Sequence, residues 1–258
     1  MDLLVVGAGE MGRWLARVVD DVDVAFADAD PAVAHAAAEA VGGEAVALDG
    51  DDRFDAVCLA VPMPAATAAV ETQAARADRA VVDVVGVMGP VVDAVRDHAP
   101  DRERLSLHPL FAPANAPGNV AAVHDATGPV TEQVRDAIGA AGNHVFDTTP
   151  AEHDEAMRTV QAAAHAAVLA YGLAREPTRP EFATPVSRRL DDLVATVTGG
   201  TPRVYRDIQR TFDGATQVAD AARRVAEADD ETFAALYREA GGDDGPPGRD
   251  PGGDTPGR

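Results

Sequence analysis

The chain has 258 residues, 46% of them hydrophobic, which is enough for two domains with a substantial core. Its 43 acidic residues outnumber 22 basic ones, all arginines, and the net charge of −21 repels nucleic-acid phosphates and anionic lipid head groups. No run of about 18 apolar residues predicts a membrane span. We therefore expect neither a nucleic acid nor a membrane as a partner. Such acidity suggests a salt-adapted protein, because a Debye length of about 3 Å in molar salt screens the self-repulsion.

The compartment is predicted from the single cysteine and from the N-terminus. Cys58 can form no intrachain disulfide, and the chain starts without the basic segment of a signal peptide. Both features predict a cytoplasmic protein. Cys58 also lies in an apolar run without a polarising neighbour, which favours a small buried hydrophobic residue over a nucleophile.

Strand-like and helix-like segments alternate along the first 60 residues, and further short apolar runs follow. Strands joined by helical segments imply right-handed crossovers and a mostly parallel sheet, as in a Rossmann-type doubly wound α/β fold. The expected helices are 11–19 and 31–41, and the expected strands are 3–6, 24–27, 44–48, 55–61, 80–84, 105–107, 120–123 and 144–146.

The pattern changes near residue 149. Thr149 and Glu152 have the spacing of a capping box, with Pro150 at the first helical position, and only helical periodicity follows. We therefore expect a nucleotide-binding domain over 1–148 and an all-helical domain over 149–240 for substrate binding and dimerisation. The Gly-, Pro- and Asp-rich tail, 241–258, has almost nothing to bury and is predicted to be disordered.

The segment from Gly7 to Gly12 matches the dinucleotide-binding pattern G-x-G-x-x-G, with Glu10 and Met11 at the variable positions. The match directly follows a strand and opens a helix, which is the context that the pattern requires. The first glycine permits a tight turn, Gly9 permits close approach of a pyrophosphate, and the last permits helix–strand packing. The free N–H groups of the helix N-terminus then face the phosphates.

The second part of the predicted cofactor site is an acidic residue at the end of the second strand. Asp28 has this place, and a carboxylate there accepts hydrogen bonds from ribose hydroxyls and repels a 2′-phosphate. We therefore expect NAD rather than NADP, although Arg13 lies nearby in sequence. Val61 and Pro62 end a later strand and are expected at the same edge of the sheet.

Two further segments carry residues suited to chemistry, although each alone also fits structural packing. His108 ends a predicted strand, and His153, Met157, Gln161 and His165 follow one another at intervals of four along a predicted helix. A metal site is not expected, because His153 and His165 would lie about 18 Å apart at 1.5 Å per residue.

Taken together, the motifs resemble those of the prephenate dehydrogenase family, over residues 1 to about 240. The family block H-P-M-F-G-P corresponds to His108–Pro113, and its helix H-D-x-x-M-x-x-V-Q-x-x-x-H corresponds to His153–His165. Two weaker matches follow, S-P-I-Y at Thr184–Ser187 and L-Y-A-D-I-Q at Val204–Gln209.

The resemblance implies oxidative decarboxylation of prephenate by NAD to 4-hydroxyphenylpyruvate, in tyrosine biosynthesis, by a homodimer. By resemblance, His108 is the base that accepts the proton of the ring hydroxyl, and an unperturbed histidine pKa of about 6.5 suits that role. Gln161 and His165 would orient the substrate. Arginines would hold its two carboxylates, and Arg188 and Arg189 are the expected candidates.

Three positions depart from the family pattern. Gly86 stands where the family has a serine close to the catalytic histidine, and Thr196 stands where it has a carboxylate-binding arginine, for which Arg206 is a third candidate substitute. Ala112 replaces a glycine. Two alternatives therefore stay open, namely a dehydrogenase for arogenate or another cyclohexadienyl acid, and a non-catalytic NAD-binding regulator. The absence of lysine argues against β-hydroxyacid dehydrogenases, which use a catalytic lysine.

Overall fold

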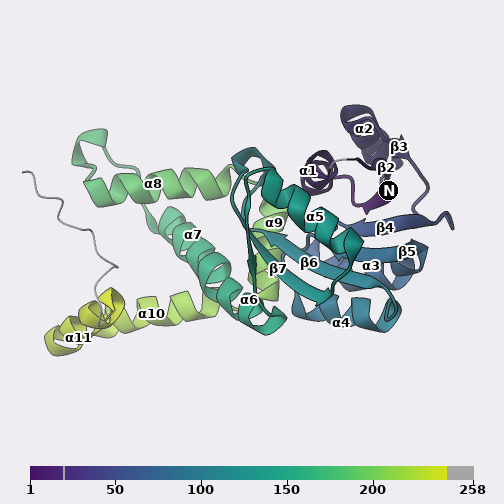
Figure 1. The fold of residues 1–258 in the computed structure, drawn as a ribbon. Helices are drawn as coiled ribbons and strands as arrows, with labels where there is room; N and C mark the ends of the chain where they lie inside the picture. Colours follow the sequence, from purple (N-terminus) through teal and green to yellow (C-terminus); the bar gives the residue numbers. More distant parts are fainter. Residues whose placement is uncertain (20, 243–258) are drawn as a thin grey trace, which may run out of the picture.

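The computed structural model describes residues 1–19 and 21–242, and it combines an eight-stranded sheet with a set of helices that extend away from it (Figure 1). Residues 243–258, which include nearly all of the predicted disordered tail, lie outside the described part of the chain.

The sheet has the strand order β3-β2-β1-β4-β5-β6-β7-β8, and every neighbouring pair is parallel except β6 and β7. This topology confirms the predicted doubly wound, mostly parallel fold. The order runs outwards from β1 in both directions, so the switch point lies between β1 and β4, where such sheets bind ligands. The strands are β1 (Asp2–Val6), β2 (Asp23–Ala27), β3 (Glu44–Ala45), β4 (Phe54–Leu59), β5 (Ala77–Asp83), β6 (Glu103–Pro109), β7 (Asn119–Ala126) and β8 (His144–Asp147).

Helices cover both faces of the sheet because successive side chains of each buried strand point to opposite faces. Leu3 and Val5 of β1 belong to the core under α1 (Glu10–Val18), α2 (Pro31–Val41) and α5 (Pro129–Ala140). Leu4 and Val6 belong to the core under α3 (Ala66–Gln73) and α4 (Gly89–His98). The strands are therefore apolar on both sides, which explains why their sequences lack alternation.

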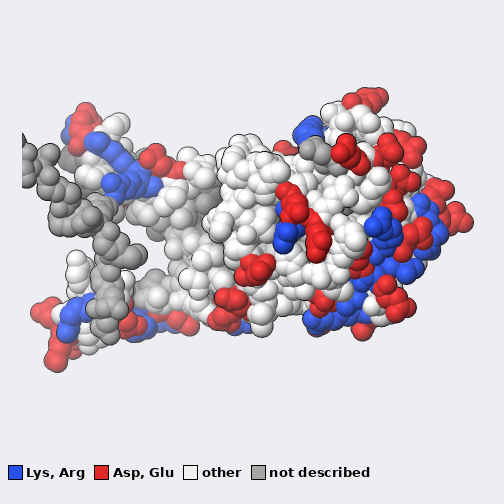
Figure 2. Space-filling view, in the orientation of Figure 1, with Lys and Arg blue, Asp and Glu red and all other residues white. Residues whose placement is uncertain are grey.

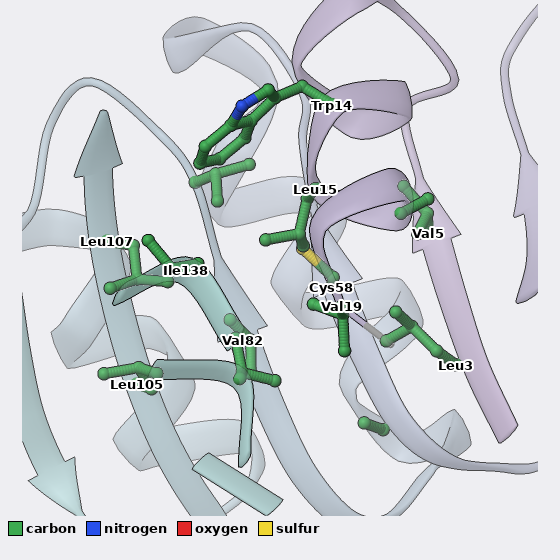
Figure 3. Close-up of a cluster of buried hydrophobic side chains, with 14 of the residues drawn as sticks. Leu3, Val5, Trp14, Leu15, Val19, Cys58, Val82, Leu105, Leu107 and Ile138 are labelled. Atoms are coloured by element: carbon green, nitrogen blue, oxygen red, sulfur yellow. The ribbon is translucent and has the colours of Figure 1, made fainter. Parts of the chain in front are cut away.

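Cys58 lies in the first of these cores, among Leu3, Leu15 and Val82 (Figure 3). Its side chain is fully buried, and that burial raises the pKa of the thiol well above its usual value, with a smaller contribution from Asp83. The structure thus confirms Cys58 as a small hydrophobic core residue.

The third predicted strand is shorter than expected. Its apolar pattern extends over 44–48, yet only Glu44 and Ala45 pair with β2. The guanidinium of Arg76, which is buried, donates to the carbonyl oxygens of Ala47 (3.3 Å) and Leu48 (3.5 Å) instead. The chain therefore leaves the sheet edge early.

The helical part begins after β8 ends at Asp147. Thr149 caps α6 (Pro150–Met157), because its hydroxyl accepts a hydrogen bond from the backbone N–H of Glu152 (3.2 Å). A π-helical segment, Arg158–Ala163, continues directly from α6. The remaining helices are α7 (Ala164–Ala174), α8 (Pro185–Thr198), α9 (Pro202–Thr211), α10 (Ala215–Glu227) and α11 (Asp230–Gly241).

The helical part of the chain contacts the sheet on one face only, through some of its helices. Met157, Ala162, Ile208 and Phe212 complete the core that α3 and α4 cover, whereas α8, α10 and α11 reach away from the sheet (Figure 1). None of the helices within residues 1–19 and 21–242 has both the length and the apolarity needed to cross a bilayer. In the view of Figure 2, acidic and basic side chains gather at the end of the sheet that lies farthest from α8, α10 and α11. A broad, largely uncharged surface lies next to them.

Candidate active site

The glycine loop after β1 has the backbone that its sequence pattern predicts. Gly7 has a φ of 96°, in the left-handed region, and a Cβ there would lie 2.4 Å from the carbonyl oxygen of Ala60. At Gly12 a Cβ would meet the carbonyl oxygen of Gly7 at 2.1 Å, so only glycine lets α1 pack this closely. At Gly9 nothing lies within 4 Å of a Cβ, which leaves room for a ligand at this point of the loop.

The N-terminus of α1 and the carboxylate of Asp28 meet beside this loop. No side chain of residues 1–19 and 21–242 caps α1, so its first N–H groups are available to an anion. Asp28 accepts hydrogen bonds from the backbone N–H of Ala8 (2.8 Å) and Asp30 (3.0 Å), which holds its carboxylate at the end of β2. Val61 lies beside Gly7, since its side chain is 3.2 Å from a Cβ built there. These residues could hold the pyrophosphate and a ribose of a dinucleotide.

His108 lies near the carboxyl end of β6, with 9% of its surface exposed. Its Nδ1 lies 2.8 Å from Nε2 of His153, and the two rings meet edge to face. Burial lowers the pKa of His108 to about 3, with a further lowering by His153 and an opposing effect of Asp154. The unperturbed pKa of about 6.5 expected for this histidine is therefore corrected downward, because the ring is buried. His108 is a neutral imidazole at physiological pH, with a lone pair on one of its ring nitrogens.

Asp154 continues this chain of contacts. Its Oδ1 lies 2.8 Å from Nδ1 of His153 and accepts a hydrogen bond from the backbone N–H of Met88 (3.0 Å), while Oδ2 accepts from that of Gly89 (2.9 Å). Burial opposes ionisation of the carboxyl, but the hydrogen bonds from His153, Met88 and Gly89 outweigh it and lower its pKa. The carboxylate thus sits at the N-terminus of α4, where the helix dipole also favours negative charge.

The other nitrogen of His108 faces the loop that follows β5. A Cβ built on Gly86 would lie 3.4 Å from Nε2 of His108 and 3.2 Å from the sulfur of Met63. The position where the family pattern has a serine therefore lies beside Nε2 of His108. Phe111 anchors the segment after His108 to the nucleotide loop, because its ring meets Trp14 of α1 edge to face at 5.5 Å.

Gln161 and His165 lie on and just after the π-helical segment, and both are partly buried. The spacing of four from His153 to His165 predicts one continuous α-helix, and this expectation needs correction at 158–163, where the hydrogen bonds span five residues and widen the turn. The ring of His165 meets Tyr205 of α9 edge to face at 4.8 Å, and its Nδ1 is buried without a hydrogen-bond partner in the described structure.

The arginines are not brought together with His108. Val194 of α8 packs against Gly172 of α7, so the first turns of α8 lie beyond the C-terminal half of α7, away from His165 at its start. Arg188 and Arg189 are both exposed there, and Arg188 donates to the carbonyl oxygen of Ala183 (3.4 Å). Arg206 is exposed and forms an ion pair with Asp207 (2.8 Å).

Two residues without an expected role, His153 and Asp154, stand out in this geometry. They are the adjacent H-D pair of the family helix, but only the fold shows that His153 contacts a histidine 45 residues earlier in the chain and that Asp154 contacts His153 in turn. Thr196, at the position of the family arginine, is exposed and donates to the carbonyl oxygen of Asp192 (2.9 Å).

Known proteins resemble this chain both in sequence and in fold. A 4-amino-4-deoxyprephenate dehydrogenase of Streptomyces pristinaespiralis is 36% identical over 267 aligned positions, which cover 93% of this chain and 90% of that protein. No family model matches the sequence.

Solved structures of similar fold include two dehydrogenases. The prephenate dehydrogenase of Aquifex aeolicus in complex with hydroxyphenyl propionate and NAD+ has a TM-score of 0.69 and 17% identity, with 92% of this chain and 95% of that chain covered. The arogenate dehydrogenase of Synechocystis has a TM-score of 0.62 and 17% identity, with 94% and 98% covered. At these identities the likeness concerns the fold, whereas the 36% identity over nearly the whole length concerns the family. The chain is therefore a dehydrogenase and belongs to the prephenate dehydrogenase family.

Proposed function

We propose that this chain catalyses the NAD-dependent oxidative decarboxylation of a cyclohexadienyl dicarboxylate, with 4-amino-4-deoxyprephenate as its preferred substrate. The observation that carries the proposal is the neutral, buried His108, whose Nε2 faces the loop at Gly86 rather than a protein hydroxyl. The 36% identity to a 4-amino-4-deoxyprephenate dehydrogenase favours the amino substrate over prephenate and arogenate.

The residues around the glycine loop fit a dinucleotide. Gly9 leaves open space, the N-terminus of α1 has no side-chain cap, and the Asp28 carboxylate is held at the end of β2. The nicotinamide ring supplies the hydride acceptor when NAD is bound. A carboxylate at Asp28 disfavours a 2′-phosphate, so NADP should be the poorer cofactor.

His108 accounts for the proton that must leave as the substrate is oxidised. When the ring carbon that carries the ammonium or hydroxyl group gives up its hydride, that group must lose a proton. The Nε2 of a neutral imidazole accepts it. Breaking the bond to the ring carboxylate then leaves an electron pair that aromatises the ring, with release of carbon dioxide. The proton held by His108 is available to return to the product.

Gly86 is expected to influence whether the enzyme prefers an amino or a hydroxyl group on the substrate ring. A serine there would place a hydroxyl next to Nε2 of His108, where it would compete for the lone pair or bind the substrate's own oxygen. Glycine leaves that lone pair to the substrate alone. An ammonium group, with three N–H donors and no acceptor, gains most from such an uncommitted acceptor.

Gln161 and His165 are proposed to orient the substrate from the helical side. The unpartnered Nδ1 of His165 is a polar atom that a bound ligand can satisfy. Because Arg188 and Arg189 lie away from His165 within one chain, we propose that they serve the substrate carboxylates only across a dimer.

The test is NADH formation, followed at the nicotinamide absorbance, with 4-amino-4-deoxyprephenate, prephenate and arogenate, each with NAD and with NADP. We expect the highest kcat/KM with the amino substrate and NAD, and His108→Ala should retain NAD binding while turnover falls about 10²-fold or more. Gly86→Ser should raise the ratio of prephenate to amino-substrate turnover. Turnover of none of the three substrates by a protein that binds NAD would instead support the non-catalytic alternative.

A further inference from the structure

His108, His153 and Asp154 form a chain of hydrogen bonds, and the carboxylate of Asp154 at its end sets the direction of each bond. Asp154 accepts from the N–H groups of Met88 and Gly89, so its carboxylate is fixed against the first turn of α4. A carboxylate has no proton to give, and therefore its contact with Nδ1 of His153 (2.8 Å) requires a proton on that nitrogen.

This contact decides the tautomer of His153. A neutral imidazole carries one N–H, and which nitrogen bears it is set by the hydrogen bond of the other ring nitrogen. With Nδ1 protonated, Nε2 of His153 has a lone pair. Its partner at 2.8 Å, Nδ1 of His108, must then be the donor.

The same logic reaches the reactive atom. With its single proton on Nδ1, His108 presents a bare Nε2 toward Gly86, which is the form that can accept a proton. The opposite tautomer would present an N–H there and could not act as a base. The contact between the two rings is itself buried.

We propose that His153 and Asp154 are positioning residues that hold His108 in the tautomer with a free Nε2. The proposal rests on His108 as the base of the proposed function and deepens it. The N-terminus of α4 orients Asp154, Asp154 orients His153, and His153 orients His108. During turnover the protonated His108 would be stabilised by the same chain, since its Nδ1–H keeps an acceptor.

A purely structural reading predicts a different outcome. If the contacts only pack α6 against α4, an isosteric change at Asp154 should lower stability and leave the imidazole tautomers alone. Asp154→Leu is the sharpest such change. Oδ1 of Asp154 accepts from Met88 and contacts His153, while Oδ2 accepts from Gly89, so an amide could keep an oxygen facing His153, whereas leucine of similar shape removes the acceptor. Nδ1 of His153 then loses its acceptor, and a proton on Nε2 becomes populated in both histidines.

The experiment is long-range ¹H–¹⁵N correlation NMR of the uniformly labelled protein with NAD bound, with the ring signals assigned from single-histidine variants. In the unaltered chain, we expect Nδ1 protonated and Nε2 bare in both His108 and His153. In Asp154→Leu, we expect a population with Nε2 protonated in both. Asp147→Leu is the control, because Asp147 is an exposed carboxylate 3.2 Å from Nε2 of His124, away from the site, and its loss should leave the tautomers of His108 and His153 unchanged.

Turnover provides the second readout. Asp154→Leu should lower kcat about 10²-fold or more while KM and NAD affinity change little. Should that variant fail to fold, His153 supplies a second test. His153→Gln retains an oxygen acceptor for Nδ1 of His108, and it should keep at least about tenfold more activity than His153→Leu, which has none.

A protonated Nε2 on His108 in the unaltered chain, or unchanged tautomers in Asp154→Leu, would overturn the proposal. Equal loss in His153→Gln and His153→Leu would do the same. The NMR measurement needs no substrate, so it distinguishes failure of the tautomer proposal from failure of the proposed function.

Discussion

Asp83 is a buried carboxyl group at the end of β5, with only 2% of its surface exposed. Burial raises its pKa from 3.8 to about 7, against the lowering effect of a hydrogen bond from the backbone N–H of Val85. Below pH 3.8 the group is protonated in both the folded and the unfolded chain. As the pH rises through 7, the folded protein has to give up a proton that its interior favours, and stability is lost.

Asp83→Asn should therefore stabilise the protein at pH 8 relative to pH 5, by up to a few kcal/mol, because the amide stays neutral and still accepts from Val85. Thermal unfolding of both proteins at the two pH values checks this. Asp192→Asn, at an exposed position on α8, serves as the control. A Tm difference between Asp83→Asn and the unaltered chain that is the same at both pH values would contradict the assignment.

At this scale, single residues were predictable where chemistry demands one residue type. Gly7 has a positive φ and Gly12 has no space for a Cβ, so the G-x-G-x-x-G pattern by itself predicts both roles. The role of Asp154 was not predictable, because it depends on the N–H groups of Met88 and Gly89, which lie 66 and 65 residues earlier.

The π-helical segment shows how one element depends on its neighbour. Gln209 of α9 donates from Nε2 to the carbonyl oxygen of the buried Ala162 (2.8 Å). This contact satisfies an acceptor inside the widened turn and ties α9 to the segment that carries Gln161.

Gln209→Leu should lower the free energy of unfolding by about 1–3 kcal/mol, because it leaves the Ala162 carbonyl without its partner. It should also raise KM more than it lowers kcat, since Gln161 and His165 lose their fixed positions while His108 does not. Chemical denaturation and steady-state kinetics measure both. Gln217→Leu, on the exposed surface of α10, is the control. A variant as stable as the control would show that the turn does not need this hydrogen bond.

On the scale of the whole molecule, apolar side chains are distributed unevenly. Every large hydrophobic residue of the described chain that is exposed lies in the helical part, between Val160 and Tyr237. Leu173 is 88% exposed and Tyr237 is 75% exposed, on helices that reach away from the sheet (Figure 1). A second copy of the chain is the partner that we expect to cover them.

The protein should therefore be a homodimer of twice 26.7 kDa in light scattering, at low salt and in molar potassium chloride. Leu173→Asp should shift it toward the monomer, because a carboxylate at a buried interface is costly. A monomer under every condition would refute the dimer. The salt series also tests salt adaptation, which stays a prediction, through the loss of stability expected at low ionic strength.

The sequence by itself determined the fold class, the glycine loop and the candidate base, because strand–helix periodicity, glycine stereochemistry and the block around His108 are local properties of the chain. Only the tertiary structure decided which residues contact His108 from behind and that Arg188 and Arg189 lie away from it. The hydrogen bonds from His108 to His153 and from Asp154 to α4 join separate elements, and the direction of α8 sets where Arg188 and Arg189 fall. Such contacts depend on how packed elements meet in space, and spacing along one helix does not carry that information.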